Sequence, residues 1–156
     1  MDLKELRKSK KLTQSEASKI IGMPLRTYVN YENDDSKAGS LKHRFIMEKM
    51  EEYGRLDEEH GILSLEDIRT ACQEAFKPEQ VDFCYLFGSY AVNEAGERSD
   101  VDLLISTSLS GIDFFGLVEE LRTRLHKRID LLPVASLTGN AELLHAVLKD
   151  GVKIYG

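Results

Sequence analysis

The chain has 156 residues, a formal net charge of −6 at pH 7 and 42% hydrophobic residues, which suits one ordinary domain or two small ones. No apolar run is long enough to span a bilayer, and the polar, charged N-terminus differs from a secretory signal. Cys72 and Cys84 lack a Cys-x-x-Cys spacing and fall at apolar positions, so they are expected to be small buried hydrophobes. These features predict a cytoplasmic protein with no membrane partner.

Charge is distributed unevenly along the sequence. Residues 1–57 hold 12 lysines and arginines against 10 aspartates and glutamates, whereas residues 58–156 hold 9 against 17. The first 30 residues alone hold 7 basic side chains against 3 acidic ones. A basic N-terminus on an acidic body predicts a nucleic-acid contact confined to the N-terminal part.

Three short helices are predicted in the first third of the chain. The first is basic and ends near Lys10. Thr13-Gln14-Ser15-Glu16 is a capping-box pattern that begins the second helix, which ends at Gly22. Pro24 suits the first position of the third helix. The residues expected to face inward are Leu3, Leu6, Tyr28 and Tyr31.

The stretch from Leu12 to Glu32 resembles the Xre/Cro-like repressors, in which a helix-turn-helix binds operator DNA. The third helix would present Arg26, Thr27 and Asn30 outward, and arginine and asparagine can bond guanine and adenine in the major groove. Gln14, at the start of the second helix, is expected to touch phosphate or an adjacent base. The alternative is a small helical bundle used for protein contact, with these side chains merely solvated.

A polar, turn-rich stretch over residues 33–40 leads to a helix predicted from Leu41 to about Tyr53. In Xre-like proteins a helix at this place completes the domain or pairs two subunits. The charged segment over residues 55–61 is expected to link two domains. We therefore predict a helix-turn-helix domain with its connecting helix over residues 1–57 and a second domain over residues 62–156.

Helical and strand-like patterns alternate in this second domain. Residues 64–67 cap a helix whose apolar stripe is expected to be buried. Strands are predicted at residues 81–87, 101–106 and 128–134, with a helix near 112–127 between the last two. The fold class is therefore α plus α/β, an all-helical domain followed by an α/β domain with a small mixed sheet.

The chemistry is concentrated where the first two predicted strands meet a loop. Gly88-Ser89 follows the first apolar run, and Asp100 and Asp102 flank Val101 in the second. Alternate residues of a strand share a face, so the two carboxylates would project together, where they repel each other unless a cation lies between them. Mg²⁺ takes one or two carboxylates together with substrate phosphates. A glycine and a small hydroxyl beside it can hold those phosphates.

Gly-Ser, ten intervening residues and Asp-x-Asp resemble the signature of the nucleotidyltransferase superfamily related to polymerase β, in its short MNT-type form. The resemblance spans about residues 62–156 and implies a third carboxylate on a neighbouring strand, for which Asp130 is the candidate. The family usually has glycine where this chain has Asn93. Asparagine tolerates the left-handed conformation better than most residues, so the loop is expected to keep its geometry.

Minimal nucleotidyltransferases of this kind are typically antitoxins paired with HEPN-type ribonuclease toxins, to which they transfer AMP from ATP at a tyrosine. The resemblance implies that Gly88 and Ser89 hold the triphosphate, while Asp100, Asp102 and Asp130 hold Mg²⁺ and carry the catalysis. An attached repressor-like domain fits an antitoxin that represses its own operon. The expected partners are the toxin and operator DNA, in a homodimer or a hetero-oligomer with the toxin.

Two other functions remain open from the sequence. In the first, the nucleotidyltransferase fold masks the toxin by contact alone and ATP is incidental. In the second, the protein modifies a small molecule such as an antibiotic, although such enzymes usually carry an additional helical domain for the acceptor. A DNA-binding N-terminus has no obvious use in that second case.

Overall fold

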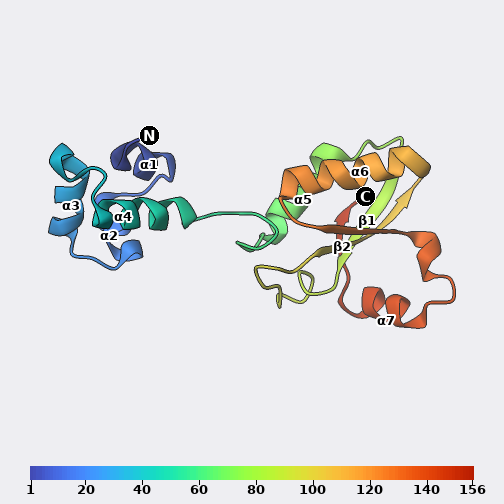
Figure 1. Ribbon diagram of the computed structural model, residues 1–156. Coiled ribbons are helices and arrows are strands. Elements are labelled where there is room, and N and C mark those ends of the chain that lie inside the picture. The colour runs from blue at the N-terminus through green and yellow to red at the C-terminus, as the bar shows by residue number, and fades with distance from the viewer. The chain divides into compact units, whose positions relative to one another are not determined.

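The computed structural model describes all 156 residues. The chain divides into two compact units, the helical unit over Met1–Arg55 and the α/β unit over Leu56–Gly156, each with its own hydrophobic core. Figure 1 shows helices alone in the first unit and helices around a sheet in the second. The predicted fold class, a helical domain followed by an α/β domain with a small mixed sheet, is confirmed.

The helical unit contains four α-helices and a short 3₁₀ turn: α1 (Leu3–Ser9), α2 (Gln14–Ile21), α3 (Leu25–Asn33), η1 (Asp35–Lys37) and α4 (Leu41–Glu52). Thr13 and Glu16 form the expected capping box, and α2 ends at Gly22, whose φ of +82° is left-handed. Pro24 is the N-cap of α3 rather than its first residue, because its ψ is still extended. The core of the unit consists of Leu3, Leu6, Ala17, Tyr28, Ile46 and Met50.

The α/β unit adds three α-helices, four strands and a second 3₁₀ turn: α5 (Leu65–Ala75), β1 (Val81–Phe87), β2 (Val101–Thr107), α6 (Gly111–Leu125), β3 (Ile129–Pro133), η2 (Val134–Leu137), α7 (Ala141–Asp150) and β4 (Val152–Tyr155). The strand order is β3-β2-β1-β4, and β2 pairs with β3 in parallel, whereas β1 pairs with β2 and with β4 antiparallel. The sheet is therefore mixed, as predicted.

The sheet is covered on both faces (Figure 1). The larger core lies under α5 and α6, and a smaller one lies on the opposite face under α7. Cys72 and Cys84 are buried free thiols in the larger core, as expected. The neighbouring Cys72 thiol, together with burial, raises the pKa of Cys84 above its usual range, so Cys84 is a packing residue rather than a reactive one.

The segment predicted as an interdomain linker packs instead on the α/β unit, which begins at Leu56 rather than at residue 62. Leu56 contacts the larger core, and Glu58 accepts hydrogen bonds from Arg122 and Arg128. These arginines lie 64 and 70 residues further along the chain, so no local pattern could indicate the pairing. No helix combines the length and apolar character needed to cross a lipid bilayer.

Candidate functional site

The predicted nucleotide-binding turn and the three predicted aspartates lie at one end of the sheet. Asp102 on β2 lies opposite Asp130 on β3 in the parallel pairing, and opposite Phe87, the last residue of β1. Asp100 lies one residue before β2 begins, and Gly88 directly follows β1. Because β1 ends where β2 and β3 start, the topology places the Gly88-Ser89 turn and the carboxylates together.

The alternation along β2 decides which side of the sheet carries this site. Val101 and Leu103 are fully buried in the core beneath α5 and α6, as predicted, whereas Asp102 between them is only partly buried. Leu104, the next residue on the Asp102 side, belongs to the small core beneath α7. Asp102 therefore lies on the α7 face of the sheet, next to the small core in which β2 packs against α7.

Gly88 is held close to the carboxylate of Asp102. Its φ is +72°, a left-handed conformation, and a Cβ added there would overlap the Asp102 carboxylate. Glycine is therefore required twice, once by the backbone conformation and once by the space. Asn93, in the loop that follows, has a φ of +59°, as expected for an asparagine that replaces a glycine.

The three carboxylates act on one another electrostatically. Burial, together with the negative charges of Asp130 and Asp100, raises the pKa of Asp102 to about 6. Asp100 and Asp130 are themselves exposed. A partly buried carboxylate crowded by two others is an environment that favours a bound cation.

The donor set fits a hard divalent cation that is completed by its substrate. No three His, Cys, Asp or Glu side chains converge closely enough to hold a metal ion by themselves. Mg²⁺ does not need such a cage, because it usually binds one or two carboxylates and takes water and phosphate oxygens as its other ligands. Asp102, with Asp100 and Asp130 beside it, can provide those protein ligands next to the Gly88-Ser89 turn.

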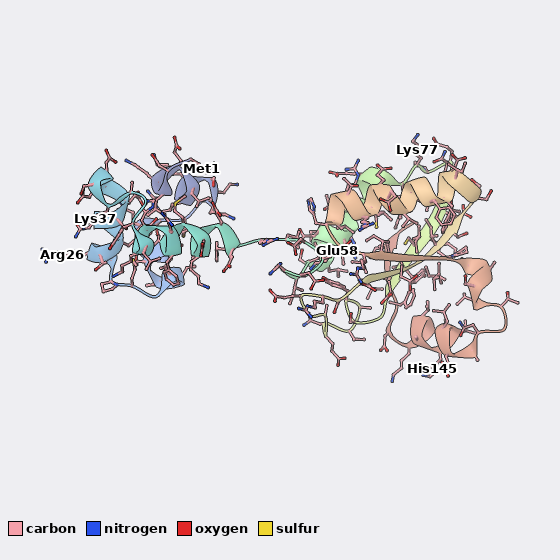
Figure 2. The ribbon with its side chains drawn as sticks, viewed as in Figure 1. Met1, Arg26, Lys37, Glu58, Lys77 and His145 are labelled. Atoms are coloured by element: carbon pink, nitrogen blue, oxygen red, sulfur yellow. The ribbon has the colours of Figure 1, made fainter.

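A second set of predicted residues lies on α3 of the helical unit. Arg26 and Asn30 are exposed one helical turn apart, and Thr27 between them is half-buried. Figure 2 shows Arg26 projecting away from the body of this unit. Tyr28 is fully buried and fixes the inner side of the same helix. The exposed side of α3 can therefore present a guanidinium and an amide to a groove of DNA.

Gln14 is placed differently from these three residues. Its side-chain amide donates to the Glu32 carboxylate at 3.3 Å, so it is partly engaged within the unit. Glu32 is fully buried and accepts two hydrogen bonds from Arg7, at 2.9 and 2.8 Å. Burial alone would raise the pKa of Glu32, but the hydrogen bonds and charge of Arg7 outweigh it and lower that pKa.

Sequence reasoning did not find this Arg7–Glu32 pair. The two residues are 25 positions apart, and each alone looks like an ordinary surface charge on a short helix. Arg7 also donates to the Leu12 carbonyl at 2.7 Å, which ties α1 to the segment that precedes α2. The pair orders α3 and thereby the residues that it presents.

Residues 66–156 match the model described as polymerase beta nucleotidyltransferase, which covers the site and its four strands. The chain belongs to this nucleotidyltransferase family. Residues 3–40 match a helix-turn-helix model, so this nucleotidyltransferase carries a helix-turn-helix domain ahead of its sheet.

Solved structures similar to this nucleotidyltransferase come from toxin–antitoxin complexes. One, a toxin–antitoxin with AMP-PNP, has 24% sequence identity and a TM-score of 0.48, covering 60% of this chain and 74% of that chain. Another, a tri-AMPylated HEPN toxin with its MNT antitoxin from Shewanella oneidensis, has 22% identity and a TM-score of 0.43, covering 57% and 70%. The search of curated proteins finds no significant match.

Proposed function

We propose that this protein transfers AMP from ATP to a hydroxyl of a partner protein, with Mg²⁺, and that its helical unit binds operator DNA. The single observation that carries the enzymatic part is the Asp102 carboxylate, held against the backbone of Gly88 and opposite Asp130. Three mutually repelling carboxylates beside a glycine turn are what a metal-assisted nucleotidyl transfer needs.

Each residue then has a role that its position supports. The Gly88-Ser89 turn would hold phosphate oxygens through its backbone amides and the Ser89 hydroxyl, with the Asp102 carboxylate packed against Gly88. Asp100 and Asp102 would hold Mg²⁺, which neutralises charge on the α-phosphate and on the departing pyrophosphate. Asp130 would complete the ligand set and help to remove the proton from the attacking hydroxyl.

The bonds of the reaction balance as a single displacement. The acceptor oxygen forms a bond to the α-phosphorus, and the bond from that phosphorus to the oxygen bridging to the β-phosphorus breaks. Pyrophosphate leaves with the electron pair, and the proton of the acceptor hydroxyl passes to Asp130 or to water. The enzyme is expected to work above about pH 6, because Asp102 must be ionised to bind the cation and its pKa is about 6.

The acceptor that we propose is a tyrosine of a HEPN-type toxin. The sequence resembles minimal nucleotidyltransferases that act as antitoxins, and the α/β unit consists of the sheet and the helices packed on it. A macromolecular acceptor can present its own hydroxyl to an exposed site such as that of Asp100 and Asp130. The helix-turn-helix domain fits an antitoxin that represses its own operon, with the exposed Arg26 and Asn30 on α3 facing the DNA.

The test uses ATP labelled at the α-phosphate and the protein encoded by the neighbouring reading frame. We expect label on that protein with Mg²⁺, and none with the variant that combines Asp100→Ala and Asp102→Ala. Asp82→Ala, an exposed aspartate near the other end of β1, is the matched control and should label as well as the wild type. If the double variant still protects cells from the toxin as well as the wild type does, masking by contact is the function instead.

A further inference from the structure

One lysine of the α/β unit is completely enclosed. Lys127, between the end of α6 and the start of β3, has no exposed surface. Burying an ammonium is costly unless it is hydrogen-bonded. Its Nζ donates to the carbonyl of Glu97 at 2.6 Å and to that of His60 at 3.1 Å. The proposed transfer gives this lysine no part, so its burial needs another reason.

The two acceptors show what Lys127 holds together. Glu97 lies in the loop between Ser89 and Asp100, three residues before Asp100. Lys127 itself lies three residues before Asp130. The Lys127 ammonium therefore connects the segment that leads to Asp100 with the segment that leads to Asp130.

Arg128, next to Lys127, adds a backbone hydrogen bond to the same loop. The carbonyl of Arg128 accepts the hydrogen bond of the Val101 amide at 2.9 Å, so residues 127 and 128 hold the segment 97–101 at both of its ends. Within that loop the Gly96 amide donates to the Ser99 hydroxyl at 2.8 Å. Asp100 is therefore carried on a short segment whose two ends are fixed by the chain that leads into β3.

The segment before α5 also contacts Lys127 and Glu97. His60 is the second acceptor of Lys127, and the adjacent Gly61 amide donates to the Glu97 side chain at 3.3 Å. Lys127 therefore lies at the meeting point of three stretches, around residues 60, 97 and 127. A side chain without donors at position 127 would remove both of these hydrogen bonds and leave the Asp57 amide as the remaining partner of the His60 carbonyl.

We propose that Lys127 is a positioning residue that sets Asp100 and Asp130 at the separation which a divalent cation requires. The carboxylates carry like charges at the same end of the sheet and repel one another, so the loop that carries Asp100 would otherwise relax away from β3. Lys127 does not touch the substrate, and acts only through Glu97 and its own chain. The inference rests on the proposed function, because it concerns the metal site of that reaction.

The test measures Mn²⁺ binding in the presence of ATP by electron paramagnetic resonance on the full chain. Lys127→Met keeps the length of the side chain but removes its donors, and we expect Mn²⁺ affinity at least tenfold weaker than that of the wild type. Lys127→Arg restores donors and should regain part of the loss. Lys77→Met, exposed before the start of β1 (Figure 2), is the matched control and should bind as the wild type does.

Circular dichroism establishes that each variant is folded before binding is compared. A folded Lys127→Met that binds Mn²⁺ within twofold of the wild type overturns the inference, and Lys127→Gln is judged by the same criterion if the methionine variant does not fold. If the wild type itself binds no Mn²⁺ with ATP, the result contradicts the proposed function itself, and the role of Lys127 falls with it. Normal binding by both proteins leaves that function intact and removes only the role of Lys127.

Discussion

Replacing Asp102 by asparagine should stabilise the α/β unit while it destroys the site. The pKa of Asp102 lies at about 6, against an ordinary value of 3.8, because the folded state buries it beside Asp130 and Asp100. A raised carboxylate pKa means that folding disfavours the charged form. The contribution of Asp102 to stability is therefore most favourable below about pH 4, and it becomes less favourable as the pH rises toward 6.

The size of this effect follows from the shift. One pKa unit corresponds to about 1.4 kcal/mol, so the full shift would be about 3 kcal/mol, and solvent screening of a half-buried group reduces it to about 1–2 kcal/mol. Asp102→Asn should raise the free energy of unfolding by that amount at pH 7.5. The gain should shrink toward zero near pH 4, where the wild-type carboxyl is protonated as well.

Urea denaturation followed by circular dichroism, in buffers with a chelator, measures the difference at several pH values. Asp82→Asn, an exposed aspartate of β1, is the control and should show much less stabilisation. The reasoning is refuted if Asp102→Asn is no more stable than the wild type at pH 7.5, or if its advantage is the same at pH 4 and pH 7.5.

Four further results are expected. Gly88→Ala, at a φ of +72° and against the Asp102 carboxylate, should cost at least about 1–2 kcal/mol in the free energy of unfolding and weaken Mg²⁺–ATP binding more than tenfold by calorimetry. Glu32→Gln should destabilise the helical unit by about 3 kcal/mol in thermal melts, because it removes one partner of a buried pair and leaves the arginine unpaired. Arg26→Ala should cost about 1–3 kcal/mol on the specific operator and much less on random DNA, whereas an equal loss on both would mean that it contacts only phosphate. Asp130→Asn should abolish transfer but leave operator binding within about twofold, as fluorescence anisotropy can show, since the two sites belong to separate compact units.

Local patterns were sufficient for the parts of the fold that carry the site. The strand predicted over residues 81–87 matches β1, and the strand predicted over residues 101–106 matches β2 to within one residue. Both are apolar runs bounded by a glycine or an acidic turn, which is the strongest strand signal that a single sequence offers. Alternation placed Asp100 and Asp102 on one face, whereas Asp130 was implied by the family resemblance, and only the pairing of β2 with β3 shows that it lies opposite Asp102.

The end of the chain was predicted less completely. No helix or strand was expected beyond residue 134, yet α7 and β4 complete the small core and the sheet. The signal for α7 was present, since Asn140 caps the helix and Leu143 and Val147 recur at helical spacing. β4 has only four residues, too few for alternation to stand out, and it becomes recognisable as a strand through its pairing with β1.

Other features depend on residues that are distant in sequence. The enclosed Lys127 and the buried Glu32 both look like surface charges in the sequence, because charged side chains are rarely buried. Their partners lie at least 18 positions away, beyond the reach of any helix or strand period. The same reason explains why residues 55–61 were expected to link two domains, although Glu58 is paired with two arginines of the α/β unit.

The central claim is that the Gly88-Ser89 turn and the three aspartates carry nucleotidyl transfer. The most direct measurement compares ATP labelled at the α-phosphate with ATP labelled at the γ-phosphate, each incubated with Mg²⁺ and the partner protein. We predict that the partner protein acquires the α-label and not the γ-label, and that pyrophosphate is released in equal amount. A chelator should abolish both the labelling and the release of pyrophosphate. Transfer of the γ-label, or α-labelling that persists in the chelator, would contradict it.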